Sequence, residues 1–206
     1  MMDFIAGLGM VRSVPQFKKT MKYRTLLLIL SSAIALNAGD AWISLFDGKT
    51  LNGWKIQNDG NWRVEDGAIV VDQGEIGLLT TEQEWTNYEF EVEFRAQIAS
   101  NSGIFLSTKP VVADESKDCY EVNIAPPSNP FPTGSIVKRE AFVGAGEKVE
   151  WRKYRMSVKD GHVQVWLDGE KTADYQDENP LKSGLIGLQL NQGKVEFRGI
   201  RVRVLK

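Results

Sequence analysis

The sequence feature that most limits the fold is the recurrence of Asp-Gly between short alternating segments. The five pairs begin at Asp47, Asp59, Asp66, Asp160 and Asp168. Asp-Gly readily adopts the positive φ angles of tight hairpin turns, so each pair favours two antiparallel strands. The clearest case runs from residue 154 to residue 175, where apolar and polar residues alternate around two of these pairs. This segment predicts a β-meander.

Three further segments alternate with the period of a half-buried strand. They are residues 88–96, 120–124 and 195–204, and Gly199 shifts the phase of the last one as a β-bulge would. The four prolines between Ala125 and Thr133 exclude a central strand or a helix interior there. No long segment shows a convincing helical period, so the sequence predicts an all-β sandwich or jelly roll.

Composition narrows the class of protein. The chain has 206 residues, of which 42% are hydrophobic and 25% charged, with a net charge of −2. These values fit one globular domain plus a short segment, and they leave no basic excess for nucleic acid. The single cysteine, Cys119, cannot form an internal disulfide and is expected to be buried. The single histidine, His162, is expected at the surface, and its isolation excludes most histidine-based metal sites and triads.

The N-terminal segment has the pattern of a secretory signal peptide. Basic residues at 22–24 precede an apolar run that reaches Leu36, and small or polar residues follow. The run is short for a membrane span, and the alternative is a buried N-terminal helix. We expect residues 1–39 to be the signal peptide, with Met21 as a natural start, and residues 40–206 to form one domain. The mature protein is then periplasmic or secreted, without stable membrane insertion.

Two polar strand faces are candidates for chemistry, because phosphate loops, zinc spacings and nucleophile elbows are absent. Glu89, Glu91 and Glu93 share one face, which is typical either of paired glycosidase carboxylates or of a solvated sheet face. Glu121 and Asn123 share a face just before the proline-rich loop. They either bind sugar hydroxyls in a loop-walled cleft or belong to an ordinary polar face.

Aromatic and basic residues add further candidates. Aromatic rings stack on sugars but also fill sandwich cores. The six tryptophans are Trp42, Trp54, Trp62, Trp85, Trp151 and Trp166. Lys138 and Arg139 are adjacent, so on a strand they point to opposite faces and at most one enters a given site.

An ordered series of motifs identifies a known family. The segments are ISLFDGKTLNGW at 43–54, WRVEDG at 62–67, residues 88–95, NSGIFL at 101–106, YEVNI at 120–124, FPTGS at 131–135, VWLDG at 165–169, IGLQ at 186–189 and VEFRGI at 195–200. Together they resemble the 3-keto-disaccharide hydrolase domain family, formerly a domain of unknown function. The resemblance covers about residues 42–205.

The resemblance implies a concanavalin A-like jelly roll and an exported, glycan-processing enzyme of bacteria that cleaves sugars oxidised at C3. The ketone acidifies the hydrogen on C2, so a base removes it, the C1 substituent leaves and water adds. Such an enzyme needs a base and a cation or donor for the enolate oxygen. It needs no cofactor. A calcium ion bound by loop carboxylates and carbonyl oxygens remains an alternative at this stage.

Motif position and strand alternation assign the candidate residues. Glu121 is the expected base or main sugar ligand, and Arg139 or Lys138 is the expected stabiliser of the enolate. The candidate substrate contacts are Asn101, Asn123, Gln189, Asn191 and Trp151. One departure concerns Asn191, because many members of the family carry a histidine shortly after the IGLQ motif. Asparagine hydrogen-bonds but is no general base at neutral pH, so this chain either uses another base or binds without cutting.

Three hypotheses remain open at this stage. The first is an exported hydrolase or lyase of 3-keto-glycosides, with a carbohydrate as its partner. The second is a non-catalytic carbohydrate-binding module that uses exposed aromatics such as Trp85 or Trp151. The third is a conventional glycosidase, which requires the row from Glu89 to Glu93 to line a cleft.

Overall fold

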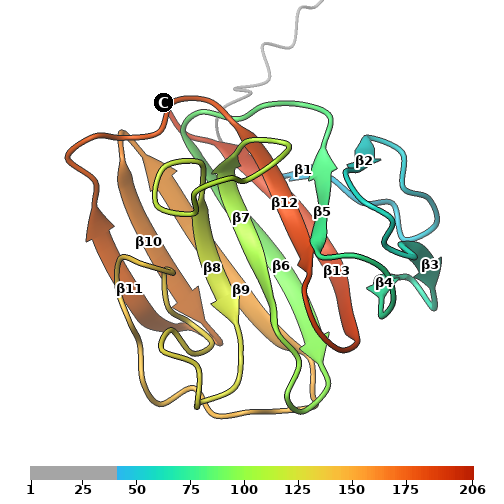
Figure 1. Cartoon of the computed structure of the whole chain (residues 1–206). Coiled ribbons are helices and arrows are strands. Elements are labelled where there is room, and N and C mark those ends of the chain that lie inside the picture. Colours follow the sequence, from blue (N-terminus) through green and yellow to red (C-terminus); the bar gives the residue numbers. More distant parts are fainter. Residues whose placement is uncertain (1–40) are drawn as a thin grey trace, which may run out of the picture. The chain divides into compact units, whose positions relative to one another are not determined.

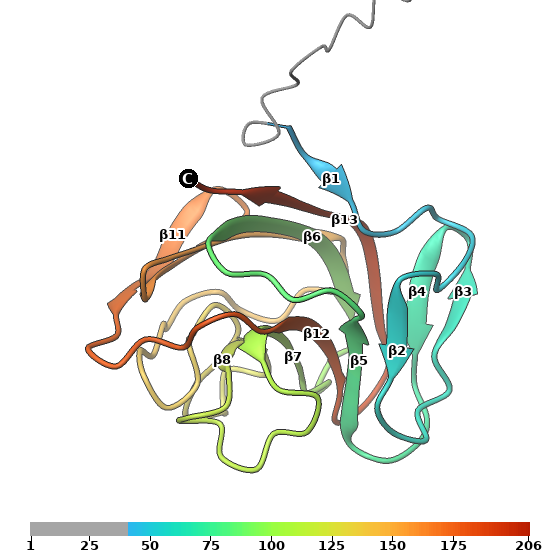
Figure 2. The same cartoon turned by 90° about the horizontal axis from the view of Figure 1, so that it is seen from above.

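The computed structural model describes residues 41–206, which form two antiparallel sheets packed face to face, without a helix among these residues (Figures 1 and 2). The larger sheet consists, in spatial order, of β11 (Glu170–Gln176), β10 (His162–Leu167), β9 (Arg152–Lys159), β6 (Tyr88–Ala96), β13 (Val195–Val204), β4 (Ala68–Val71) and β3 (Arg63–Glu65), with β1 (Ile43–Ser44) paired to β13. The smaller sheet consists of β2 (Trp54–Ile56), β5 (Gly77–Thr81), β12 (Leu185–Leu190), β7 (Ser102–Thr108) and β8 (Tyr120–Ile124). The predicted all-β jelly-roll sandwich is confirmed.

The Asp-Gly pairs divide into two groups. Those at Asp66, Asp160 and Asp168 form the predicted hairpin turns, with positive φ at both the aspartate and the glycine. The expectation is wrong for Asp47 and Asp59, which lie in loops. The carboxylate of Asp47 accepts hydrogen bonds from the backbone N–H groups of residues 49 and 50, so it stabilises a local turn rather than a hairpin.

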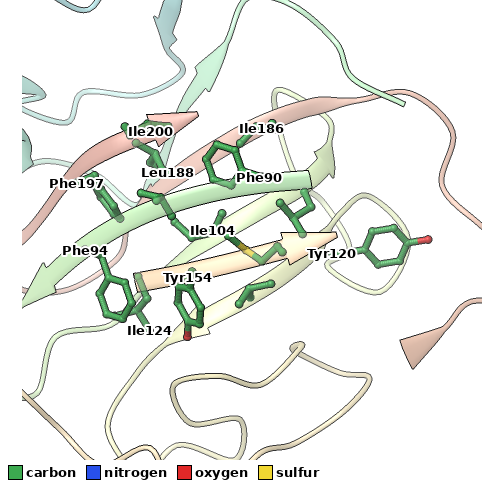
Figure 3. Packing of buried hydrophobic residues seen from close by; sticks show 14 of the residues in the cluster. Phe90, Phe94, Ile104, Tyr120, Ile124, Tyr154, Ile186, Leu188, Phe197 and Ile200 are labelled. Atoms are coloured by element: carbon green, nitrogen blue, oxygen red, sulfur yellow. The ribbon is translucent and has the colours of Figure 1, made fainter. Parts of the chain in front are cut away.

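The core lies between the sheets and follows the predicted alternation (Figure 3). Phe90 and Phe197 of the larger sheet face Ile104 and Leu188 of the smaller one, and all four are buried. The predicted bulge at Gly199 is confirmed, because the register between β13 and β6 shifts around it and its φ is +60°. The extra residue brings the side chains on both sides of the bulge into the core.

The expectations for Cys119 and His162 are confirmed, whereas the one for Trp85 is not. Cys119 is buried, as expected, and His162 is partly exposed and contacts the carboxylate of Asp174. Trp85 is only 5% exposed and belongs to the core, so it is not the exposed aromatic that the binding-module hypothesis requires. The proposed signal peptide lies outside the described residues. Within residues 41–206, no helix has the length and apolar character to cross a bilayer.

Two buried tyrosines tie the larger sheet to the backbone of the smaller one. The hydroxyl of Tyr88 on β6 accepts a hydrogen bond from the backbone N–H of Ser107 on β7, at 3.0 Å. The hydroxyl of Tyr154 on β9 donates to the carbonyl of Asn123 on β8 at 2.6 Å and accepts from the N–H of Gly134 at 2.7 Å. These bonds cross the apolar core and fix β8 together with the loop that follows it.

We predict that Tyr154→Phe lowers the free energy of unfolding by about 1–3 kcal/mol, because the change removes two buried hydrogen bonds. The N–H of Gly134 and the carbonyl of Asn123 then keep only the 3.2 Å hydrogen bond between them. Denaturant unfolding of both proteins measures the difference. Tyr175→Phe is the matched control, since Tyr175 is only partly buried where it packs against the same core. Equal losses in the two variants would show that the hydroxyl bridge contributes nothing.

Candidate functional site

The candidate site lies on the outer face of the five-stranded sheet. Ile104 and Leu188 point into the core, so their neighbours Gly103, Phe105 and Gln189 point outward. Strand register then aligns two outward rows across β5, β12, β7 and β8. One row contains Leu78, Gln189, Gly103 and Asn123, and the next contains Thr80, Gly187, Phe105 and Glu121.

Glu121 is the titratable group with the most unusual surroundings on this face. Its side chain is 5% exposed, and no donor among residues 41–206 hydrogen-bonds to its carboxylate. Burial, with a smaller effect from the negative charge of Glu115, raises its pKa to about 8, and the charge of Lys138 opposes the shift. A carboxylate with this pKa exchanges a proton near neutral pH, as a general base requires.

Gly103 provides the space for this carboxylate. A Cβ atom at position 103 would lie 2.8 Å from Oε1 and 3.0 Å from Cγ of Glu121, so the glutamate side chain folds over the glycine. The neighbours of Gly103 across the strands are Gln189 and Asn123. Each of these amides has a buried carbonyl oxygen without a hydrogen-bond partner in the described structure. The carboxylate thus lies beside two buried amide oxygens whose hydrogen-bonding capacity is unused within the described residues.

Two loops contribute charges around Glu121. The ammonium group of Lys138 pairs with the carboxylate of Glu115 at 3.0 Å. Arg139 points elsewhere, because its guanidinium donates to the carbonyls of Glu115 and Ser116 and lies 4.7 Å from the centre of the Tyr120 ring. Of the two basic residues predicted from sequence, Lys138 is therefore the cation near the carboxylate, whereas the contacts of Arg139 hold its guanidinium away from Glu121. Both residues lie in a turn rather than on a strand.

A cavity of about 210 Å³ opens on the same face, next to these rows. Its lining residues are Gln57, Ile76, Gly77, Leu78, Phe105, Pro110, Val111, Val112, Glu115 and Gln189. Phe105 is the cross-strand partner of Glu121, and Gln189 belongs to both the polar row and the cavity wall. Glu121 itself does not line the cavity, so the cavity lies beside the buried carboxylate on the same sheet face.

The structure brings most of the residues predicted from sequence to one face. Glu121, Asn123 and Gln189 lie together, and strand alternation places Asn101 and Asn191 on the same face at the end of the sheet, where residues 101 and 192 form a bridge. Trp151 does not reach this site. The guanidinium groups of Arg95 and Arg198, on the outer face of the larger sheet, lie 4.8 and 4.0 Å from the centre of its ring.

Sequence reasoning missed Glu115, Gln57 and the role of Gly103. A glycine inside an otherwise regular strand is a signal of close approach by another group, so Gly103 was open to prediction. Glu115 and Gln57 lie outside the strand segments predicted from alternation, and no periodicity marks them.

The row of glutamates on β6 lies on the outer face of the larger sheet, within a ladder of ion pairs. Glu89 pairs with Arg155 and Arg203, and Glu91 pairs with Lys153 and Arg201. Burial opposes ionisation, but the hydrogen bonds from these cations outweigh it and hold the pKa of both carboxylates below the usual value. Glu91 and Glu93 line a hollow of about 440 Å³ on this face. A glycosidase acid needs a raised pKa, and the pKa of Glu89 and Glu91 is lowered, so the ion pairs disfavour the conventional-glycosidase hypothesis for this row.

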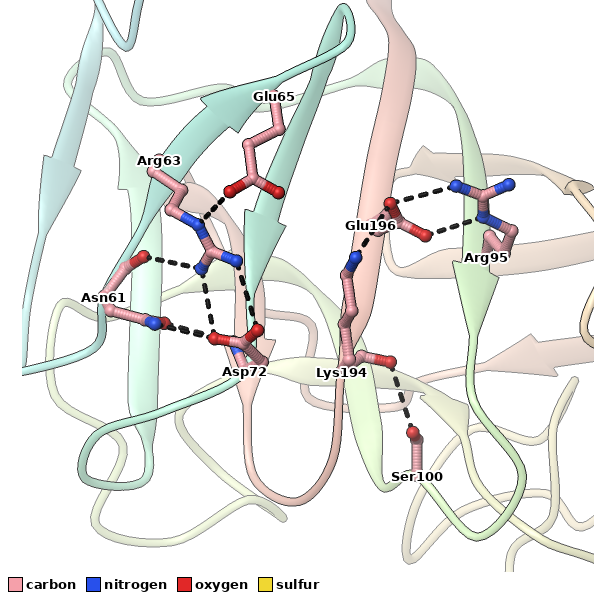
Figure 4. Close-up of polar contacts among 8 residues, drawn as sticks. All are labelled: Asn61, Arg63, Glu65, Asp72, Arg95, Ser100, Lys194 and Glu196. Carbon is pink, nitrogen blue, oxygen red and sulfur yellow. Dashed lines mark hydrogen bonds and ion pairs between the residues drawn. The ribbon is translucent and has the colours of Figure 1, made fainter.

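The ladder continues toward the edge of the sheet, where Arg95 pairs with Glu196 and Arg63 pairs with Asp72 (Figure 4). These contacts satisfy the carboxylates with cations of the same sheet face. Within residues 41–206, no group of three or more His, Cys, Asp or Glu side chains is arranged to hold a metal ion.

The β-sandwich and the ordered motifs agree with the comparisons with known proteins. The chain belongs to the 3-keto-alpha-glucoside-1,2-lyase-like domain family, whose model matches residues 41–203. A 3-keto-disaccharide hydrolase of Bacteroides thetaiotaomicron is 26% identical over 81% of this chain and 79% of that protein. The family resemblance predicted from the motifs is thereby confirmed.

Solved structures show the same fold. A glycosyl hydrolase candidate from Parabacteroides distasonis matches with a TM-score of 0.69 at 22% identity, over 80% of this chain and 94% of that one. The carbohydrate-binding module CBM66 of Bacillus subtilis matches with a TM-score of 0.60 at 12% identity, over 73% and 95% of the two chains.

We predict that Glu121→Gln stabilises the protein progressively, relative to wild type, as the pH rises from 5 to 8. The folded protein keeps the proton on Glu121 up to about pH 8, whereas the unfolded chain releases it near the ordinary value of 4.5. The stability gained from this proton is complete below the unfolded pKa and is lost as the pH rises through the folded pKa. The lost free energy is on the order of a few kcal/mol.

Denaturant titrations at several pH values measure this effect. The surface variant Glu178→Gln is the control and should follow the wild-type curve at every pH. A constant offset between Glu121→Gln and wild type across this range would contradict the raised pKa.

Proposed function

We propose that this protein cleaves 3-keto-glycosides, with the carboxylate of Glu121 removing the proton on C2 of the sugar. The observation that carries the proposal is the buried carboxylate without a hydrogen-bond partner, whose pKa is raised to about 8. Membership of the lyase-like family supports the same reaction class. We extend the proposal to an exported protein, on the basis of the signal-peptide pattern in residues 1–39.

The proposed reaction needs few protein groups. The ketone at C3 acidifies the hydrogen on C2, so Glu121 accepts this proton and the C–H electron pair becomes an enolate. The electron pair then forms a double bond between C2 and C1, and the C1–O bond breaks with its electrons on the departing oxygen. Water then adds its hydroxyl group to C1 and gives its other proton to the departed oxygen, and the proton on Glu121 returns to C2, which completes a net hydrolysis.

Other residues of the face have defined roles in this proposal. Lys138, whose ammonium group pairs with Glu115 at 3.0 Å, supplies the positive charge that stabilises the enolate. The free carbonyl oxygens of Asn123 and Gln189 accept hydrogen bonds from sugar hydroxyls. Because Glu121 is available as the base, the chain has no need of a histidine at position 191.

The direct test compares a 3-keto-glucoside with its unoxidised parent glucoside. We expect the purified protein to cleave only the oxidised sugar, because only there is the C2 hydrogen acidic. Binding of both sugars without cleavage of either would instead support a carbohydrate-binding module. Cleavage of the parent sugar would contradict the elimination mechanism.

We predict that Glu121→Gln lowers kcat/KM for the 3-keto-glucoside by at least about 100-fold, since glutamine cannot accept the proton. For the wild type, kcat/KM should rise with pH and level off above about pH 8, because the base must be ionised. Glu178→Gln should keep both the rate and the pH profile of wild type. Full activity in Glu121→Gln would remove this residue from the catalytic role.

A further inference from the structure

A small apolar cluster on the outer face of the five-stranded sheet is separate from the sandwich core. It consists of Leu78, Phe105 and Cys119, with Val112 packed against it. Leu78 and Phe105 come from the outward positions of β5 and β7, whereas Val112 and Cys119 come from the connection between β7 and β8. The loop therefore adds an apolar floor to the side of the sheet that carries the polar rows.

The cavity beside Glu121 is built on this floor. Two of its wall residues are large hydrophobics that remain in contact with water, since Ile76 is 66% exposed and Val111 is 73% exposed. They face a cavity of about 210 Å³ whose other apolar walls are Leu78, Phe105 and Val112. For comparison of size, an enclosed apolar cavity of about 150 Å³ accepts a benzene ring.

The polar groups of the cavity are few and partly engaged. Glu115 pairs with Lys138, and the amide of Gln57 donates to Thr80 at 2.9 Å. Gln189 retains a free carbonyl oxygen at the boundary with the polar row. A second sugar unit needs partners for several hydroxyl groups, and this wall offers little to them. An apolar group gains free energy from the same wall by removing its hydrophobic surface from water.

We propose that this cavity binds the aglycone of the substrate, and that the preferred substrates are 3-keto-glycosides with an apolar aglycone about as large as one aromatic ring. The inference rests on the proposed function, because the sugar ring must lie over Glu121, Asn123 and Gln189. Phe105 then lies between the two parts of the site, since it pairs with Glu121 and also lines the cavity. The C1–O bond of the substrate spans this boundary.

The test compares benzyl 3-keto-glucoside with methyl 3-keto-glucoside, which share the sugar and both leave through an alkyl oxygen. We expect wild type to prefer the benzyl compound by about tenfold in kcat/KM, from the apolar area that the phenyl group buries. Val111→Ser and Ile76→Ser should each lower this preference by about fivefold. Val143→Ser, at an 83% exposed valine outside the cavity, is the matched control and should keep the wild-type preference.

The outcomes separate this inference from the proposed function. Equal rates for both glucosides, or a 3-keto-disaccharide preferred over the benzyl compound, would overturn the aglycone assignment while the reaction stands. If no 3-keto-glycoside is cleaved, the proposed function fails. Calorimetry with unoxidised benzyl glucoside then tests whether the cavity binds an apolar aglycone. Binding that Val111→Ser weakens and Val143→Ser leaves unchanged would support an apolar aglycone pocket, and absence of binding would overturn it.

Discussion

The burial of one unpaired carboxylate organises the candidate site. Glu121 gives up most of its contact with water and receives no hydrogen bond from the described residues in return. Such burial is unfavourable for the charged form, so the carboxyl group holds its proton to an unusually high pH. The strand glycine Gly103 makes the arrangement sterically possible, because any larger residue would displace the carboxylate. Stability is thus lowered locally at the position where a base is useful.

The remainder of the sandwich compensates for this local cost and holds the site in place. A continuous apolar core joins the sheets, and the hydroxyl of Tyr154 reaches across it to the backbone of Asn123 and Gly134. These bonds fix β8, which carries Glu121, and the loop that follows it. A base on a strand anchored in this way is positioned before the substrate arrives.

Two glutamate-bearing faces of the same fold have opposite electrostatic surroundings. Glu89 and Glu91 lie on the larger sheet, where cations from β9 and β13 bind them and lower their pKa. Glu121 lies on the smaller sheet, where burial raises its pKa. Alternation along a strand identifies both sets equally well, because it reports only that a residue faces away from the core. Which carboxylates are paired with cations depends on strands that are distant in the sequence.

This distinction explains how much of the molecule was open to prediction. Alternation and Asp-Gly turns predicted β6, β8, β13 and the β9–β11 meander, since these features depend on local geometry. Glu121 with its amide neighbours followed from strand alternation and family motifs. The positions of Arg139 and Trp151 did not follow from the sequence. Arg139 lies in a turn, and Trp151 packs against arginines of the larger sheet that are distant in the sequence. The apolar cavity depends on the fold of the loop between β7 and β8, which no periodicity describes.

The central claim is that Glu121 removes the hydrogen on C2 before the C1–O bond breaks. The most direct measurement compares kcat/KM for a 3-keto-glucoside carrying hydrogen at C2 with that for the same compound carrying deuterium at C2. The account predicts a slower reaction of the deuterated compound in the wild-type protein, because the C2–H bond breaks in the elimination. Equal rates, with cleavage of the C1–O bond and retention of deuterium at C2 in the product, would contradict it.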